Sequence, residues 1–279
     1  MRLFFNVNYV TTIGEELLIH LTVQTDNDET RDRVYRMSSH NGKDWWYECD
    51  DTSFTWGTHL TYYYSVDDGG EMPPTEWKTL PHRLDLTAIK GDSYAIYNQW
   101  AVIPEDTYLY SAAFTSCFEP RHLTPFPALP FEKTVRLIVR APQLRSNERL
   151  CLTGESKVLG AWDAFKALPM YEHQRNEWVV DLNADMLDTD QLAFKFIAVQ
   201  QNNPRELLWE TGSNRTLHLP KMKKGEVLVY DLSQAFFAID DRRVAGTLVP
   251  LFSLRTKQSF GVGDFGDLKL LIEWASTTH

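Results

Sequence analysis

Cysteine is scarce in this chain of 279 residues, and its three cysteines, Cys49, Cys117 and Cys151, lie far apart without any Cys-x-x-Cys pair. An odd number of widely spaced cysteines predicts neither a disulfide framework nor a thiolate zinc site. No cluster of metal-ligating side chains and no cofactor motif stands out elsewhere in the sequence. We therefore expect reduced, mostly buried thiols, with no metal ion and no cofactor.

Long apolar runs and basic clusters are absent as well. No run reaches the roughly 20 apolar residues of a transmembrane helix, and the N-terminal segment turns polar after a few residues, unlike a signal peptide. The formal net charge is −10, whereas nucleic acids and anionic membranes attract clustered Lys and Arg. We expect a cytoplasmic protein without nucleic-acid or membrane partners, and a neutral polymer stays compatible with this charge.

Aromatic residues are plentiful, at 13% of the chain within a hydrophobic content of 43%, which is enough for well-buried cores. Short segments in which apolar and polar residues alternate, such as 3–10, 60–66 and 135–139, are separated by frequent turns. This pattern is typical of β-sandwiches. The length indicates two domains and part of a third.

Two tryptophans flank a lysine in the second half of the chain. Trp162 ends a Leu-Gly-Ala-Trp run, Lys195 lies within Phe-Lys-Phe, and Trp209 opens a Trp-Glu-Thr-Gly-Ser-Asn-Arg run that also holds Glu210 and Asn214. Each run borders a strand-like segment, so we expect these side chains to converge on one surface. Flat indoles suit the apolar face of a pyranose ring, and amide, carboxylate and ammonium groups suit its hydroxyls. A lone Trp more often packs in a core, but the combination predicts a carbohydrate-binding surface.

This spacing resembles family 20 of the carbohydrate-binding modules, the starch-binding domain. The resemblance covers about a hundred residues and implies that Trp162 and Trp209 stack on successive glucose units. It further implies that Lys195, Glu210 and Asn214 form hydrogen bonds with sugar hydroxyls. The implied ligands are α-1,4-glucans, namely starch, glycogen and maltooligosaccharides, and the implied fold is an immunoglobulin-like β-sandwich.

The first hundred residues resemble a divergent copy of the same module, because the order of strands and turns recurs. In this alignment Trp77 falls where the later copy has Trp209, and Tyr63 falls where it has Lys195. Trp77 and Tyr63 are therefore further candidate contacts for sugar. Rim packing is an equal alternative for Trp77, and a place in an alternating strand is the alternative for Tyr63.

Other parts of the first copy depart from the motif. The pair His82–Arg83 is expected where the later copy has Asn214–Arg215. A mixed-charge loop over 26–33 stands where the Leu-Gly-x-Trp run should be. One of the two indole platforms is therefore missing, and we expect weaker sugar binding by this copy.

The division that these observations predict has four parts. Residues 1–104 form the divergent module, and residues 133–237 form the second module. Between them, residues 105–132 are rich in proline and phenylalanine, which indicates an ordered linker that fixes the angle between the modules. Residues 238–279 have a different composition and are predicted to begin another domain.

In this last part, Pro250–Arg255 is expected as a strand, Gly261–Gly266 as a loop and Asp267–Ala275 as an amphipathic helix, which together predict the first βα unit of a TIM barrel. The Pro-Leu-Phe-Ser-Leu-Arg and Gly-Val-Gly-Asp-Phe-Gly-Asp-Leu runs found here resemble the entry to the catalytic barrel of glycoside hydrolase family 77, the amylomaltases or 4-α-glucanotransferases. The alternative is an ordinary Gly-rich turn between a strand and a helix.

The resemblance implies transfer of α-1,4-glucan segments by a retaining mechanism with two carboxylates. In the family those carboxylates lie in later parts of the barrel, so we assign no catalytic residue. The sequence thus predicts an all-β, glucan-binding part of a 4-α-glucanotransferase, with two tandem sandwiches ahead of a barrel. Two alternatives stay open: a non-catalytic starch-binding protein, and a scaffolding or docking role. The oligomeric state also stays open.

Overall fold

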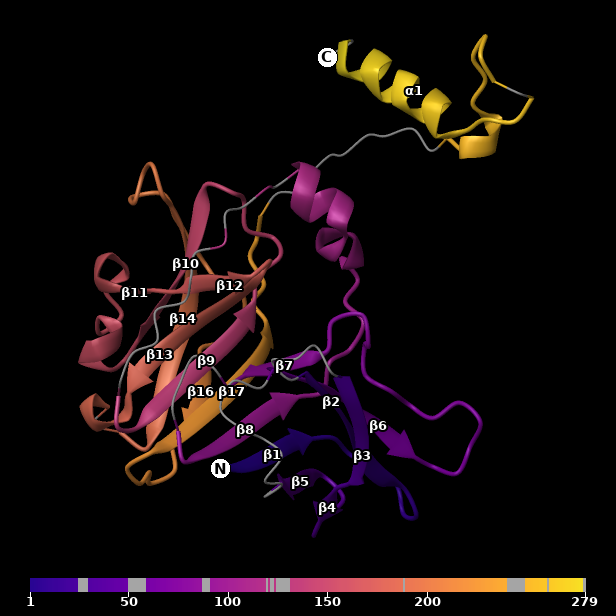
Figure 1. Ribbon diagram of the computed structural model, residues 1–279. Coiled ribbons are helices and arrows are strands. Elements are labelled where there is room, and N and C mark those ends of the chain that lie inside the picture. Colours follow the sequence, from indigo (N-terminus) through magenta and orange to yellow (C-terminus); the bar gives the residue numbers. More distant parts are fainter. Residues whose placement is uncertain are drawn as a thin grey trace. The chain divides into compact units, whose positions relative to one another are not determined.

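The chain divides into two compact units, Met1–Ala238 and Ile239–His279 (Figure 1). Within the described residues, all of the strands belong to the first unit, and the second contains one α-helix. In the described part of the chain, no helix is long and apolar enough to cross a membrane. The computed structural model describes residues 1–24, 30–49, 59–86, 91–118, 120, 123, 131–187, 189–239, 249–259 and 261–277.

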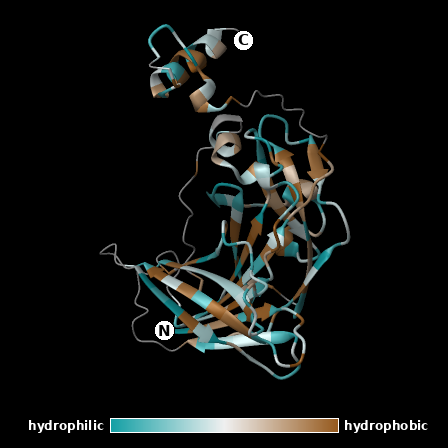
Figure 2. Cartoon of the chain, turned by 90° about the vertical axis from the view of Figure 1, so that its right-hand side faces the viewer, coloured by the Kyte–Doolittle hydropathy of each residue, from teal (hydrophilic) through white to brown (hydrophobic). Residues whose placement is uncertain are grey.

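The first half of unit one contains eight strands, and their alternating side chains build its core. In β2, for example, Leu17, Ile19 and Leu21 are buried while the residues between them are partly exposed. Figure 2 shows the same alternation of hydrophilic and hydrophobic residues along the strands of the sheets. The strands are β1 (Arg2–Asn8), β2 (Glu16–Gln24), β3 (Thr30–Arg36), β4 (Ser38–Ser39), β5 (Asp44–Cys49), β6 (His59–Asp67), β7 (His82–Asp85) and β8 (Ser93–Gln99).

The second half contains nine strands. They are β9 (Thr134–Arg140), β10 (Glu148–Gly154), β11 (Leu168–Pro169), β12 (Tyr171–Gln174), β13 (Glu177–Asn183), β14 (Gln191–Gln200), β15 (Leu207–Trp209), β16 (Arg215–His218) and β17 (Glu226–Gln234). Short helical turns connect some strands: η1 (Thr107–Tyr110), η2 (Phe114–Phe118), η3 (Lys157–Leu159), η4 (Ala164–Lys166) and η5 (Ala184–Met186).

The two halves share one sheet. Its eight strands lie in the order β12-β13-β9-β17-β8-β1-β5-β4, and β8 of the first half pairs in parallel with β17 of the second. Two smaller sheets complete the sandwiches: β3-β2-β6-β7 in the first half, and β11-β10-β14-β15, with β16 also on β14, in the second. Backbone hydrogen bonds therefore join the halves directly, so the predicted linker is not alone in fixing the angle between them.

The same pairing pattern recurs in each half. In the first, β2 pairs with β6, β6 pairs with β7, and β1 lies between β5 and β8. In the second, β10 pairs with β14, β14 pairs with β16, and β9 lies between β13 and β17. The two halves therefore share one pattern of strand pairing, and their equivalence as two modules stays a prediction.

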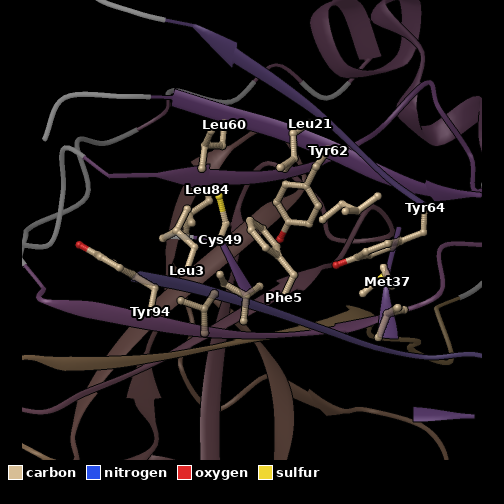
Figure 3. Packing of buried hydrophobic residues seen from close by; sticks show 14 of the residues in the cluster. Leu3, Phe5, Leu21, Met37, Cys49, Leu60, Tyr62, Tyr64, Leu84 and Tyr94 are labelled. Carbon is tan, nitrogen blue, oxygen red and sulfur yellow. The ribbon is translucent and has the colours of Figure 1, made fainter. Parts of the chain in front are cut away.

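The core of the first half extends past the β8–β17 pairing into the second half. Figure 3 shows Phe5, Tyr62 and Tyr64 among its buried side chains. Val227 and Val229 of β17 belong to this same cluster and are each 2% exposed. Because the second half supplies part of it, the core of the first half is not complete alone.

A buried polar cluster also joins the halves. His82 of β7 contacts Asp231 of β17 through Nδ1 at 2.7 Å and Glu76 through Nε2 at 3.1 Å. Burial by itself would lower the pKa of His82, but the hydrogen bonds with Asp231 and Glu76 raise it to about 9. Burial would raise the pKa of Asp231, yet its hydrogen bond with His82 holds that pKa below its ordinary value. The pair is therefore charged at neutral pH.

The predicted linker packs against the second half where the structure describes it. Leu109 is 3% exposed, and its carbonyl accepts a hydrogen bond from the Asn176 side chain at 3.2 Å. The Tyr110 hydroxyl donates to Gln234 at 2.9 Å. Residues 119, 121–122 and 124–130 of this segment lie outside the described residues.

Two sequence expectations about local structure were wrong. The mixed-charge loop over 26–33 ends at Thr30, where β3 begins, and residues 25–29 lie outside the described part. In unit two, the strand expected over 250–255 is a short helical turn, η6 (Leu251–Ser253). A strand needs a partner for its backbone groups, and the described residues of this unit provide none.

The helix expected in unit two is present as α1 (Phe265–Thr277). Its first turn is held by Asp267, whose carboxylate accepts hydrogen bonds from Thr256 and Ser259, each at 2.6 Å. The loop before it also needs glycine at Gly263, because an added Cβ would lie 2.1 Å from the Leu251 carbonyl oxygen. The turn and the helix are therefore closely packed on each other.

The buried pair predicts how stability depends on pH. A group whose pKa rises on folding stabilises the protein fully below its unfolded pKa of about 6.5, and this contribution disappears as the pH rises through the folded pKa. Since the folded pKa of His82 is about 9, the free energy of unfolding should fall by about 2–3 kcal/mol between pH 6.5 and pH 9.5. Urea unfolding at several pH values measures this.

Asp231→Asn keeps the shape of the side chain but removes its charge, and should flatten the pH dependence. His40→Gln, at an exposed histidine, is the matched control and should leave it unchanged. A single transition is expected for both halves because they share a sheet. Two separate transitions, or equal slopes in the wild type and Asp231→Asn, would contradict the coupling.

Candidate functional site

Trp209 is presented by a strand at the edge of the second half's smaller sheet. It ends β15, pairs with Ile197 of β14, and is 37% exposed, which is unusual for so large an apolar side chain. A Trp in a core would be nearly inaccessible, as Trp178 is at 4%. Trp209 therefore offers an indole face to solvent from a rigid element.

Lys195 of β14 holds the loop that follows Trp209. Its Nζ donates to the carbonyl oxygen of Gly212 at 2.6 Å. An ammonium group has three donors, so this contact uses one of them. Asn214 lies further along the same loop and is exposed. Within the described residues its side chain makes no hydrogen bond that would occupy it, which leaves its amide for a ligand.

Trp162 lies in a tightly wound loop between β10 and β11. Gly160, Ala161 and Trp162 all have positive φ angles, of 84°, 51° and 65°. A Cβ at Gly160 would approach the Lys166 carbonyl oxygen to 2.8 Å, so only glycine fits there. The backbone N–H of Trp162 donates to Gly154 at 2.8 Å. The loop is thus a strained but well-held support for the half-buried indole.

The strand register brings the three residues to the same end of the sheet. Gly154, which anchors Trp162, follows Thr153, and Thr153 pairs with Lys195. Lys195 in turn holds the loop after Trp209. The register therefore brings the loop of Trp162, Lys195 and the loop after Trp209 to one end of this sheet, and their action as one sugar site stays a prediction.

Glu210 occupies a different position from the one expected of a sugar contact. Its side chain is 4% exposed and pairs with Arg215, with Oε1 2.5 Å from Nη2 and 2.9 Å from Nε. Its other oxygen accepts the backbone N–H of Phe196 at 3.3 Å. Since both oxygens are engaged beneath the surface, Glu210 braces the loop. Direct contact with sugar stays a prediction that this placement does not favour.

Arg215 is a structural residue that our site prediction did not include. Besides pairing with Glu210, it donates to the carbonyl oxygens of Leu232 and Gln234, each at 2.8 Å. Its guanidinium thus joins the loop that carries Asn214 to the end of β17. Arg215 ends the Trp-Glu-x-Gly-x-Asn-Arg run. The presence of a Glu and an Arg in this one run was the sequence feature that could have predicted the ion pair.

The register corrects the alignment of the first half with the second. Glu76 N–H donates to Tyr64 at 3.0 Å, just as Glu210 N–H donates to Phe196 at 2.9 Å. Tyr64 and Phe196 are therefore equivalent, and so are Glu76 and Glu210. Tyr63 consequently does match Lys195, as predicted.

Trp77, by contrast, does not match Trp209. It follows Glu76 and so matches Thr211, whereas Thr75 is the residue that matches Trp209. The sequence order Glu-Trp in the first half against Trp-Glu in the second caused the error. Trp77 instead packs its ring edgewise on Tyr110, with centroids 5.4 Å apart. The first half therefore lacks both indole platforms.

Two further positions in the first half differ from the prediction. His82 pairs with Tyr62 exactly as Arg215 pairs with Phe194, so His82 alone matches Arg215 and a proline precedes it where Asn214 would be. Tyr63 stacks on His20 at 4.4 Å between ring centroids, and the Lys78 ammonium lies 4.9 Å from the Tyr63 centroid. The faces of this Tyr ring are thus already in contact with neighbours, and its role as a sugar contact stays a prediction.

The geometry can be summarised as an exposed indole, a half-buried indole, an ammonium group and an amide on a rigid edge. No group of three or more potential metal-ligating side chains occurs in the part of the chain that is described. Such a surface suits a neutral, hydroxyl-rich ligand with apolar faces.

Comparison with known proteins identifies this region. The family model described as "Starch binding domain" matches residues 132–228, which contain Trp162, Lys195, Trp209 and Asn214. Residues 132–228 are thus similar to starch-binding domains, and two curated glucanotransferases are similar to parts of the chain.

The 4-alpha-glucanotransferase DPE2 of Oryza sativa subsp. japonica is 25% identical over 223 residues, which cover 76% of this chain and 23% of that protein. The cyclomaltodextrin glucanotransferase of Thermoanaerobacterium thermosulfurigenes is 35% identical over 99 residues, covering 34% and 13%. The chain thus spans less than a quarter of the length of either relative. The family 20 module of the maltotetraose-forming amylase from Pseudomonas saccharophila STB07 superimposes with a TM-score of 0.30 at 13% identity, covering 36% of this chain and 99% of that one.

The different positions of Glu210 and Asn214 predict different effects on stability. Glu210→Gln removes a charge that neutralises a partly buried Arg215, so the free energy of unfolding should fall by about 1–3 kcal/mol. Asn214→Ala changes an exposed side chain and should shift the free energy of unfolding by less than about 0.5 kcal/mol. Urea unfolding of both variants beside the wild type measures the contrast, and equal losses would contradict the bracing role of Glu210.

Proposed function

We propose that the second half of unit one binds α-glucan chains on the surface formed by Trp162, Lys195, Trp209 and Asn214. The observation that carries the proposal is the exposed indole of Trp209 at a rigid sheet edge, inside the segment that matches the starch-binding domain. The ligands proposed are starch, glycogen and maltooligosaccharides.

Stacking supplies the affinity in this proposal, and the polar groups supply orientation. An indole offers a large apolar face at low entropic cost, because two χ angles position it and the supporting backbone is already ordered. The Lys195 ammonium, which contacts the loop at Gly212, and the Asn214 amide further along that loop provide donors and an acceptor for hydroxyl groups. A ligand that curves, as α-1,4-glucans do, then contacts both indoles.

The whole protein, in this proposal, is a 4-α-glucanotransferase of the amylomaltase type that transfers α-1,4-glucan segments by a retaining mechanism. The similarity to two glucanotransferases supports this, and so does the resemblance of residues 250–268 to the entry of a family 77 barrel. The modules would hold long glucans near the active site, which would lie elsewhere in the protein. A cytoplasmic location belongs to the same proposal.

We propose that the first half is a divergent family 20 module that no longer binds sugar in the usual place. The recurrence of strand pairing supports common descent of the halves. Its position equivalent to Trp209 holds Thr75, which provides no platform, and its position equivalent to Asn214 holds Pro81, which provides no amide. Because β8 of the first half pairs with β17, we propose that the first half supports the second half structurally.

The decisive experiment is a calorimetric titration of the chain with β-cyclodextrin, with Trp162→Ala and Trp209→Ala as variants. Each substitution removes a stacking platform and should weaken binding by about 1–3 kcal/mol. Trp274→Ala is the matched control, because Trp274 is a 64% exposed indole on α1 of the other unit, and it should bind like the wild type.

Binding of equal strength in the wild type and in both variants would place the glucan site elsewhere. Absence of binding in the wild type would overturn the proposal and favour a docking role for the sandwiches. Circular dichroism of each variant verifies that a loss of binding does not come from unfolding.

A further inference from the structure

A second concave site lies where the two halves of unit one meet. It is a pocket of about 560 Å³, within the range of about 300–1,000 Å³ that small-molecule sites have. None of the four residues of the proposed glucan surface lines it. Its walls come from both halves and include Trp77, Ile103, Asp106, Arg140, Gln234 and Phe236.

The pocket has apolar surfaces that are exposed to solvent. Val102, Ile103 and Phe236 are 70%, 69% and 52% exposed. The half-buried Trp77 lies beside them, held edgewise against Tyr110. Apolar side chains gathered at a concavity are unusual on a soluble protein and indicate a binding surface. Both aliphatic and aromatic groups are therefore available to the C–H face of a ring.

A polar group inside the pocket lacks a partner. Asp106 Oδ1 is buried, and among the described residues no donor reaches it. The other oxygen of Asp106 accepts from Gln234 at 3.3 Å, and Gln234 in turn accepts from the Tyr110 hydroxyl at 2.9 Å. A buried acceptor without a donor is costly, and the carboxylate that carries it belongs to the lining of the pocket.

The charges of the pocket indicate which ligands fit. Arg140 contributes one positive charge, and Glu105 and Asp106 contribute two negative charges, so phosphates and other anions are disfavoured. Arg140 Nη2 has only a long contact to Leu80, at 3.5 Å, and its Nε lies 4.0 Å from Glu177. The guanidinium therefore retains donors for a neutral, hydroxyl-rich ligand.

We propose that this pocket is a second α-glucan site, and that it takes the free end of a chain. The proposal rests on the proposed function for the identity of the sugar. A free end enters a concave pocket, whereas the closed ring of β-cyclodextrin offers no end. The open surface around Trp209, in contrast, accepts either form of glucan.

The pocket is connected to the first surface by two hydrogen bonds, one from a backbone N–H and one from the Arg215 side chain. Phe236 accepts from the Thr211 N–H at 2.7 Å, and the carbonyl of Gln234 accepts from Arg215 at 2.8 Å. The wall of the pocket thus supports the loop that begins after Trp209. A long glucan that reaches both places would gain affinity by multivalency, without any new contact.

The test follows the indole N–H resonance of Trp77 by NMR while maltotriose is added. The protein is the whole chain with Trp162→Ala and Trp209→Ala, so that the first surface is removed. Maltotriose should shift the Trp77 resonance saturably, and β-cyclodextrin should leave it in place. Adding Ile103→Glu, at an exposed position, should weaken this maltotriose binding at least tenfold without affecting folding.

Met72→Ala is the control. Met72 is 91% exposed and lies between β6 and β7, as Trp77 does, but it does not line the pocket. It should leave the response of Trp77 unchanged. The inference is overturned if maltotriose leaves Trp77 unmoved, if Ile103→Glu has no effect, or if ultracentrifugation shows that a second copy of the chain fills the pocket.

These failures can be told apart from failure of the proposed function. If β-cyclodextrin binds the wild type and the Trp209→Ala variant loses it, while Trp77 never responds to maltotriose, only the second site is wrong. If Trp77 responds but the wild type gains no affinity from Trp162 or Trp209, the first surface is wrong and the second site holds.

Discussion

The arrangement of unit one depends on the parallel pairing of β8 with β17 and on the buried contact of His82 with Asp231 across it. Parallel strands from two repeats become neighbours in a single sheet, and a buried charged pair holds the smaller sheet of the first half to this seam. A buried ion pair adds less to stability than to specificity of arrangement. The two halves are therefore fixed in one relative orientation.

This constraint explains how a half without indole platforms still serves binding. It completes its own core with Val227 and Val229 of the second half, and it contributes Trp77 and Ile103 to the pocket at the seam. The first surface needs rigidity more than area, because stacking on Trp209 depends on an ordered loop. Lys195 and Arg215 provide that order from opposite sides.

Local patterns in the sequence were sufficient for most strands of unit one. Trp162, Lys195 and Trp209 could be placed together because each borders a strand whose register follows from alternation. Trp77 was aligned with Trp209 although Thr75 is the matching residue. Both segments contain a Trp next to a Glu, so a shift of two residues in the alignment could not be recognised from the sequence. The burial of Glu210 was missed because a carboxylate reads as exposed until its Arg partner is located. The β8–β17 seam is a contact between residues more than 130 positions apart, and no local pattern encodes it.

The most direct test of the central claim is a crystal structure of this chain with bound maltoheptaose. The account predicts glucose rings stacked on the indoles of Trp162 and Trp209, with hydroxyl groups within hydrogen-bonding distance of Lys195 and Asn214. Ordered sugar elsewhere, with both indoles bare at a saturating concentration of ligand, would contradict it.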